Sequence, residues 1–173
     1  VVCVVGLLIW QAPNIWSKMV GGTTGVTSHS LGDQINADRI LILGNSLTFY
    51  NDAPSLLADM LKKADPSGNY FLTSASWPGY TLNNHLNRKE VKELFTENWN
   101  TVILQGHSGA AFEGKGYVEN SIKELLPLVE KSHAKPISVM TFADKCYFNN
   151  QSVISQSYRE ADRKLKVPTI AIR

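Results

Sequence analysis

The sequence is poor in cysteine and lacks the spacing of a metal site. Its 173 residues include two cysteines, Cys3 and Cys146. Cys3 lies in an N-terminal segment that resembles a targeting signal, so the mature chain is expected to hold one thiol and no internal disulfide. Neither cysteine has a Cys or His partner at metal-ligand spacing, and we therefore predict no structural metal site.

Clustered charge is also missing. The 17 basic and 15 acidic residues give a formal net charge of +2 and are scattered along the chain. No group of Lys and Arg side chains is dense enough to follow a phosphate backbone. We therefore predict that nucleic acid is not a partner.

Long apolar runs are absent, but the chain begins with a short one. Residues 1–10 are apolar and uncharged, and the first residue is Val rather than Met. Ten residues are too few to span a bilayer, yet they fit the h-region of a secretory signal or the stub of a membrane anchor, with a buried strand as the alternative. Residues 11–37 are rich in Gly, Ser and Thr without a period, which indicates a linker. We expect an extracytoplasmic protein whose N-terminus is truncated.

From residue 38 onward the pattern becomes that of one α/β domain, 38–173. Short apolar runs alternate with longer stretches of helical period, which is typical of βαβ units and a parallel sheet. In such a sheet every strand-to-helix exit opens on the same edge, so residues far apart in sequence converge there. Five strands are predicted, at residues 40–43, 70–75, 101–104, 136–142 and 167–172.

The first strand exit carries a candidate nucleophile. It reads Gly-Asn-Ser-Leu-Thr over residues 44–48, with Ser46 two residues past the strand and just ahead of a helix. A serine there is held out of the sheet near helix N-terminal N–H groups, which can stabilise the oxyanion formed when an ester is attacked. The alternative is that Ser46 only caps a turn. Thr48 in place of a final glycine excludes the G-x-S-x-G elbow of α/β-hydrolases.

Four stretches in order resemble the conserved blocks of SGNH (GDSL-like) hydrolases. Residues 40–54, ILILGNSLTFYNDAP, resemble the first block, in the branch that reads Gly-Asn-Ser-x-Thr. Residues 77–82, WPGYTL, resemble the second block, and LQGHS at 104–108 stands where the family has its third. Residues 140–143, MTFA, resemble the end of the fourth strand. The agreement of four ordered pieces is more specific than any one of them.

This resemblance implies a flavodoxin-like three-layer α/β/α sandwich that hydrolyses an ester, often an acetyl or other acyl group on a carbohydrate. In the family's scheme Ser46 attacks the carbonyl. The backbone N–H groups of Ser46 and Gly79, with one side chain from the third block, hold the oxyanion. No cofactor is needed.

The third block departs from the family pattern. Its usual oxyanion donor is Asn, whereas this chain offers His107 at that position, with Gln105 as a neighbour. A neutral imidazole donates one hydrogen bond, so the role requires the right tautomer. Three interpretations of His107 remain open: an oxyanion donor, a substitute base, or a polar loop residue.

The family's base-bearing block is also missing. The Asp-x-x-His that follows the fifth strand in the family occurs nowhere in the 173 residues. We therefore expect a C-terminally incomplete chain that can bind acyl substrates but turns them over poorly, because serine at neutral pH is a weak nucleophile without its base. The other histidines, His29, His85 and His133, are predicted to be solvated surface groups.

Some further residues leave two interpretations open. Trp77 and Tyr80 could form an aromatic wall for a sugar ring or could simply pack a loop. Asp144 could line the pocket or lie in a surface turn, and Asn150 begins an N-x-S glycosylation pattern.

The sequence thus predicts a carboxylic ester hydrolase that acts through an acyl-serine intermediate. One rival is a non-catalytic SGNH-like domain that binds a carbohydrate or a protein through the same pocket. A second rival, a phosphate or nucleotide binder using residues 44–48, is weaker because that loop has one glycine and no lysine.

Overall fold

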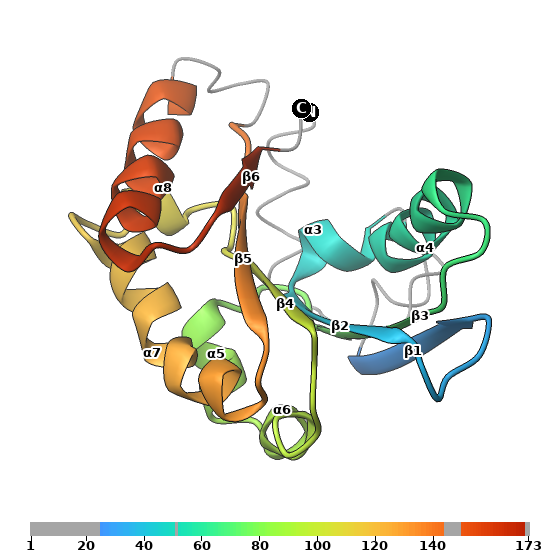
Figure 1. The fold of residues 1–173 in the computed structure, drawn as a ribbon. Helices are drawn as coiled ribbons and strands as arrows, with labels where there is room; N and C mark the ends of the chain where they lie inside the picture. Colours follow the sequence, from blue (N-terminus) through green and yellow to red (C-terminus); the bar gives the residue numbers. More distant parts are fainter. Residues whose placement is uncertain (1–24, 51, 144–149, 172–173) are drawn as a thin grey trace.

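A six-stranded sheet forms the centre of the computed structural model, which describes residues 25–50, 52–143 and 150–171 (Figure 1). The strand order is β1-β3-β2-β4-β5-β6. β1 runs antiparallel to β3, and all other neighbours pair in parallel. The strands are β1 (Gly25–Leu31), β2 (Asp38–Gly44), β3 (Tyr70–Ser76), β4 (Thr101–Gln105), β5 (Lys135–Met140) and β6 (Thr169–Ala171).

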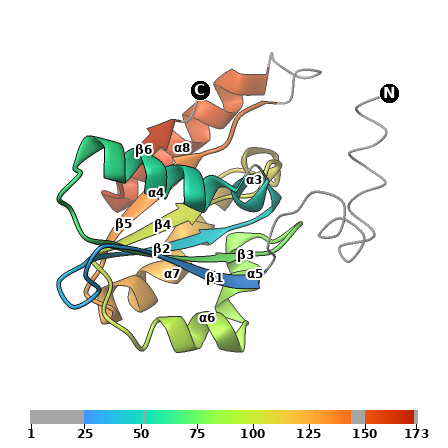
Figure 2. The same cartoon turned by 90° about the vertical axis from the view of Figure 1, so that its right-hand side faces the viewer.

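Helices cover both faces of this sheet and complete a three-layer α/β/α sandwich. α3 and α4 lie on one face, while α5, α6, α7 and α8 lie on the other (Figure 1). Figure 2 shows α4 on one side of the strands and α5, α6 and α7 on the opposite side. The helices are α3 (Ser46–Phe49), α4 (Ala53–Ala64), α5 (Leu82–Leu86), α6 (Lys89–Leu94), α7 (Tyr117–Lys131) and α8 (Gln151–Leu165), with a 3-10 turn η1 (Ala110–Phe112).

The strand order places a topological switch point at the carboxyl ends of β2 and β4. The chain leaves β2 toward β3 on one side, then returns from β3 to β4 on the other side of β2. Helices from the two crossovers therefore cover opposite faces of the sheet on either side of this point. In open α/β sheets this is where ligands bind.

The two central strands are fully covered, as their continuous apolar runs predict. Leu41 and Leu43 of β2 and Val102 and Leu104 of β4 have no exposed surface. Such strands have lost the period-two alternation because helices pack on both faces. The five predicted parallel strands correspond to β2 to β6.

A sixth strand corrects the predicted linker. Residues 25–31, inside the 11–37 stretch, form β1 along the edge of β3. The side chains of β1 alternate between half-buried and exposed, and the Ser28 hydroxyl lies 2.9 Å from the Thr73 hydroxyl. This alternation involves mostly polar residues, so a search for apolar period could not detect it.

The packing face of α4 also differs from its apolar stripe. Leu56, Leu57, Met60 and Leu61 recur at helical spacing and predict an apolar stripe, yet Leu56 and Met60 are 57% and 58% exposed. The helix instead buries Pro54 and Ala58 where it packs against β3 and β1. Leu57 and Leu61 are half-buried beside them, so the face that meets the sheet is turned away from Leu56 and Met60. Among the described helices, none is both long and apolar enough to cross a membrane.

Candidate active site

The sheet register brings the candidate residues to one edge. Gly44, the last residue of β2, stands opposite Ser76, the last residue of β3. On the other side of β2, Leu43 stands opposite Leu104, next to the end of β4. Ser46, Gly79 and His107 follow these three strand ends within three residues, so all three lie at the carboxyl edge of the sheet.

Residues 44–48, here called the serine turn, are held by Asn45. This residue is the N-cap of α3, and its Oδ1 accepts a hydrogen bond from the Leu47 amide at 3.0 Å. Its Nδ2 donates to the Gly106 carbonyl at 3.1 Å, which ties the end of β2 to the end of β4. Asn45 is 2% exposed, and its bond to Gly106 is buried. Ser46, the first residue of the helix, is half-buried.

Gly44 and Thr48 of the serine turn fit each other. A Cβ on Gly44 would collide with the Thr48 side chain, which is buried and donates a hydrogen bond to Gln105 Oε1. Thr48 therefore occupies the space next to Gly44 and links the turn to β4. This contact gives a physical reason for the Gly-Asn-Ser-x-Thr pattern.

Residues 77–80, here called the glycine turn, follow β3. Pro78 and Gly79 occupy its central positions, Gly79 has a φ of 72°, and the Tyr80 amide donates to the Trp77 carbonyl at 3.2 Å. A positive φ at the third residue is the requirement of a type II turn, and it favours glycine. The chain then enters α5 through a reciprocal capping box between Thr81 and Asn84.

Trp77 and Tyr80 pack within the glycine turn. Their ring centroids are 5.2 Å apart, and the Arg88 guanidinium lies 4.0 Å above the Trp77 ring. Arg88 also donates to the Tyr80 hydroxyl and forms a 3.2 Å ion pair with Glu90. Because one face of Trp77 is covered by Arg88, these contacts favour the packing interpretation over a sugar-binding wall.

His85 is not the solvated group that the sequence predicts. It lies on α5, is 1% exposed, and its Nε2 is 2.9 Å from the Gly44 carbonyl oxygen. A carbonyl only accepts, so Nε2 carries the proton, while the buried Nδ1 has no hydrogen-bond partner. Burial lowers the pKa of His85 to about 4, the Gly44 bond opposes this and Arg88 adds to it. The apolar surroundings supplied by the sheet and the aromatic turn were not visible in the sequence.

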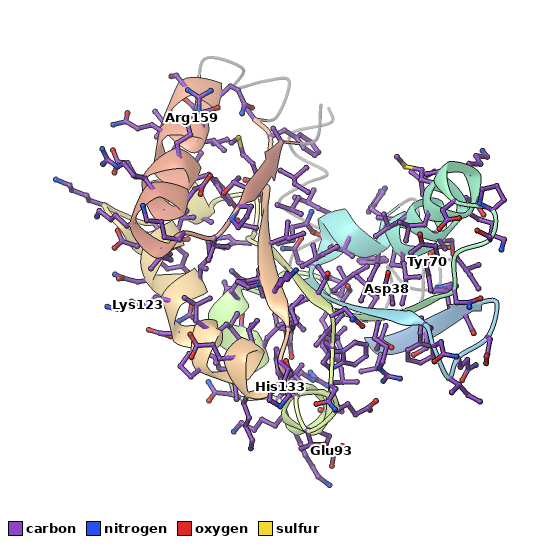
Figure 3. The ribbon with its side chains drawn as sticks, viewed as in Figure 1. Asp38, Tyr70, Glu93, Lys123, His133 and Arg159 are labelled. Atoms are coloured by element: carbon purple, nitrogen blue, oxygen red, sulfur yellow. The ribbon has the colours of Figure 1, made fainter. Side chains whose placement is uncertain are left out.

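The other two histidines lie away from the strand exits. His29 is half-buried on β1, within the segment predicted to be a linker. His133 is exposed just before β5, and Figure 3 shows it away from α3. Its solvated state agrees with the prediction.

Because His85 is buried, we expect the protein to lose stability in mild acid. Its pKa is lowered from 6.5 to about 4 in the folded protein. Between these two pH values His85 is protonated in the unfolded chain and neutral in the folded protein. The contribution of neutral His85 to the free energy of unfolding is therefore fully present above pH 6.5. The free energy of unfolding falls by about 3 kcal/mol as the pH drops toward 4. Urea unfolding of the wild type and His85→Gln at several pH values measures this. An equal pH slope in both proteins would contradict the assignment.

His107 follows β4 and faces a carboxylate. Its Nε2 lies 3.3 Å from Glu113 Oε1, its side chain is 19% exposed, and its ring meets Tyr117 edge to face at 5.7 Å. When Nε2–H donates to Glu113, a neutral ring has only an acceptor left at Nδ1. The doubly protonated ring donates at both nitrogens. The bond to Glu113 therefore leaves Nδ1 of His107 for the reaction, as an acceptor in the neutral ring and as a donor in the doubly protonated ring.

Sequence reasoning missed Asn45, His85 and Glu113 as site residues. Asn45 lies inside the recognised block, so its position offered a signal. Glu113 returns to His107 through η1, and no sequence period marks this loop. Asp144 lies outside the described residues, and Asn150 directly precedes α8. Within the described ranges, no group of three or more His, Cys, Asp or Glu side chains could hold a metal.

No protein-family model and no curated protein sequence matches the chain. Solved structures do match. A protein of Slackia heliotrinireducens described as an SGNH hydrolase aligns with a TM-score of 0.67 and 22% identity over 78% of each chain. A psychrotrophic esterase of a Pseudoalteromonas species has a TM-score of 0.59 and 14% identity, over 79% of this chain and 78% of that one. An acetyl xylan esterase has a TM-score of 0.60 and 15% identity, over 78% and 77%.

At these identities the likeness shows the fold alone. The chain has the SGNH-hydrolase fold, a flavodoxin-like three-layer sandwich, as the four ordered sequence blocks predict. The antiparallel β1 is added at the edge of β3. The chemistry of the site must therefore be argued from the residues at the carboxyl edge of the sheet.

Proposed function

We propose that this chain is a carboxylic ester hydrolase that acts through an acyl-serine intermediate on Ser46. The observation that supports it best is the serine turn, which presents Ser46 at the first position of α3, at the switch point of an SGNH fold. The Asn45 cap and its bond to Gly106 hold this turn in one arrangement. A pre-organised nucleophile at the first position of a helix suits acyl transfer.

The proposed reaction has two displacements. Ser46 Oγ attacks the ester carbonyl carbon and its proton passes to a base, while the carbonyl oxygen becomes an oxyanion held by the Ser46 and Gly79 amides. The C–O bond to the alcohol breaks, the alcohol leaves with the proton, and an acyl-Ser46 ester remains. Water then attacks this ester by the same route and releases the carboxylic acid. We assign the third oxyanion donor to His107, a role that requires a proton on the ring nitrogen that does not face Glu113.

The proposed scheme needs a general base that accepts the proton of Ser46, and we assign no residue to this role. His85 cannot serve, because Nε2 is bonded to Gly44 and burial lowers its pKa to about 4. The family's Asp-x-x-His block is absent from the 173 residues. An added small base such as imidazole is therefore expected to raise turnover.

We propose an acetyl or other small acyl ester of a carbohydrate as the substrate class. An acetyl xylan esterase is among the structural neighbours. The charge-free residues 1–10 support an extracytoplasmic location, where such substrates occur.

Labelling by an organophosphonate tests the nucleophile. A phosphonate ester inhibitor suits the test because the Pseudoalteromonas neighbour is inhibited by monoethylphosphonate. Incubation with a fluorophosphonate, with and without imidazole, is expected to give one covalent adduct, which peptide mass spectrometry maps to Ser46.

The matched control for the labelling is Ser55→Ala, which changes a serine on the neighbouring helix α4 and should leave the adduct intact. No adduct at Ser46, even with imidazole, would reject the enzyme and favour the rival of a non-catalytic carbohydrate- or protein-binding domain. An adduct elsewhere would reject Ser46 as the nucleophile.

A further inference from the structure

His85 connects the two turns that carry the proposed oxyanion donors. It is fully covered, yet its ring makes one hydrogen bond, from Nε2 to the carbonyl of Gly44 at 2.9 Å. Its second nitrogen has no partner. A buried polar ring with half of its hydrogen-bonding capacity unused costs free energy. An apolar side chain would avoid that cost, so the one bond that His85 does make requires an explanation.

The ring is fixed relative to the glycine turn. The centroid of His85 lies 5.7 Å from that of Trp77 and 5.5 Å from that of Tyr80. The capping box of Thr81 and Asn84 starts the helix α5 immediately after this turn and thereby sets where His85 stands. His85 therefore packs directly against the glycine turn.

The same ring is fixed to the serine turn through Gly44. The Gly44 carbonyl belongs to the peptide bond that joins Gly44 to Asn45, the residue whose side chain caps α3. Its direction sets the orientation of that peptide plane, and hence the path of the backbone into Ser46. His85 therefore reaches the serine turn from the element that carries the glycine turn.

We propose that His85 is a positioning residue, which holds the Ser46 and Gly79 amides at the separation that one oxyanion requires. This inference rests on the proposed function. The two amides follow different strands, and donors stabilise an oxyanion only within a narrow range of distance and direction. Asn45 provides the corresponding connection between β2 and β4 through its bond to Gly106.

Two substitutions separate the hydrogen bond from the ring volume. His85→Phe keeps a planar ring and removes the donor, whereas the side-chain amide of His85→Gln can still donate to the Gly44 carbonyl. We expect kcat for a chromogenic acetate ester to fall about tenfold in His85→Phe with KM within about twofold, and to recover to within about threefold in His85→Gln. His133→Gln, at an exposed histidine, is the matched control and should leave kcat unchanged.

Backbone amide hydrogen exchange gives a readout that does not depend on turnover. The amides of Leu47, Thr48 and Phe49 should exchange faster in His85→Phe than in the wild type, and at the wild-type rate in His85→Gln. In the unsubstituted protein, ¹H–¹⁵N correlation of the imidazole should show a proton on Nε2 and none on Nδ1.

The outcomes distinguish the two proposals. An unsubstituted protein that neither turns over esters nor labels at Ser46 would reject the esterase, while the exchange and tautomer results still report on His85. Unchanged exchange in His85→Phe, an equal loss of kcat in both variants, or a proton on Nδ1 would overturn the positioning role. If His85→Phe does not fold, the tautomer and the kcat of His85→Gln decide.

Discussion

With imidazole supplied as the base, replacing Ser46 by alanine is expected to lower ester turnover by about 10³-fold or more while leaving the fold intact. The substitution removes the oxygen that forms the acyl intermediate, and no neighbouring hydroxyl on α3 can take its place without moving the helix. It keeps the Asn45 cap, the Gly106 bond and the contact of Thr48 with Gln105. The measurement is the initial rate of hydrolysis of a chromogenic acetate ester, with far-UV circular dichroism to confirm folding.

The rates measured with added imidazole require a background correction. Imidazole catalyses the hydrolysis of activated esters by itself, so the rate with Ser46→Ala plus imidazole is subtracted from the rate with the unsubstituted protein plus imidazole. Ser55→Ala serves as the control for a serine-to-alanine change. Equal rates for Ser46→Ala and the unsubstituted protein would show that any observed hydrolysis does not pass through Ser46.

Replacing His107 by alanine should have the second largest effect, a fall of about 10²-fold in kcat with little change in KM. That is the size expected when one oxyanion donor is lost, because the bond strengthens only as negative charge develops on the carbonyl oxygen. His107→Asn restores the donor that the family has at this position and should keep kcat within about tenfold of the unsubstituted protein. Steady-state kinetics of the three proteins measures both values.

These two variants also discriminate among the three roles that the sequence leaves open for His107. Equal activity in His107→Ala and the unsubstituted protein would mean that His107 is only a polar loop residue paired with Glu113. If His107→Asn is as impaired as His107→Ala, His107 acts as a base, since an amide can donate a hydrogen bond but cannot accept the proton of Ser46. If His107 is an oxyanion donor, kcat must be higher in His107→Asn than in His107→Ala.

The parallel strands could be predicted because burial on both faces leaves a direct trace in the sequence. Leu41, Leu43, Val102 and Leu104 have no exposed surface and all belong to the hydrophobic core, which requires apolar side chains. Convergence of the strand exits then follows from the geometry of any parallel sheet. The sequence therefore predicts that Ser46, Gly79 and His107 lie at one edge of the sheet, although it does not predict their surroundings.

The features that escaped prediction depend on contacts between distant segments. β1 pairs through its backbone and through hydroxyl groups such as Ser28 with Thr73, so it has no apolar signature. His85 has the sequence context of a short polar helix, yet the sheet and the glycine turn bury it. The outward position of Leu56 on α4 likewise depends on which face meets β3 and β1.

The α/β class, the five parallel strands and the block that carries Ser46 can be read from the amino-acid sequence, because these depend on local apolar runs and on short turns with specific residues. Three features depend instead on contacts between distant segments: His85 is buried against the Gly44 carbonyl, Glu113 faces His107, and Trp77 lies beneath Arg88. Burial and hydrogen-bond partners are properties of segments brought together by the sheet, and the protonation and orientation of a side chain depend on those partners rather than on its neighbours in sequence.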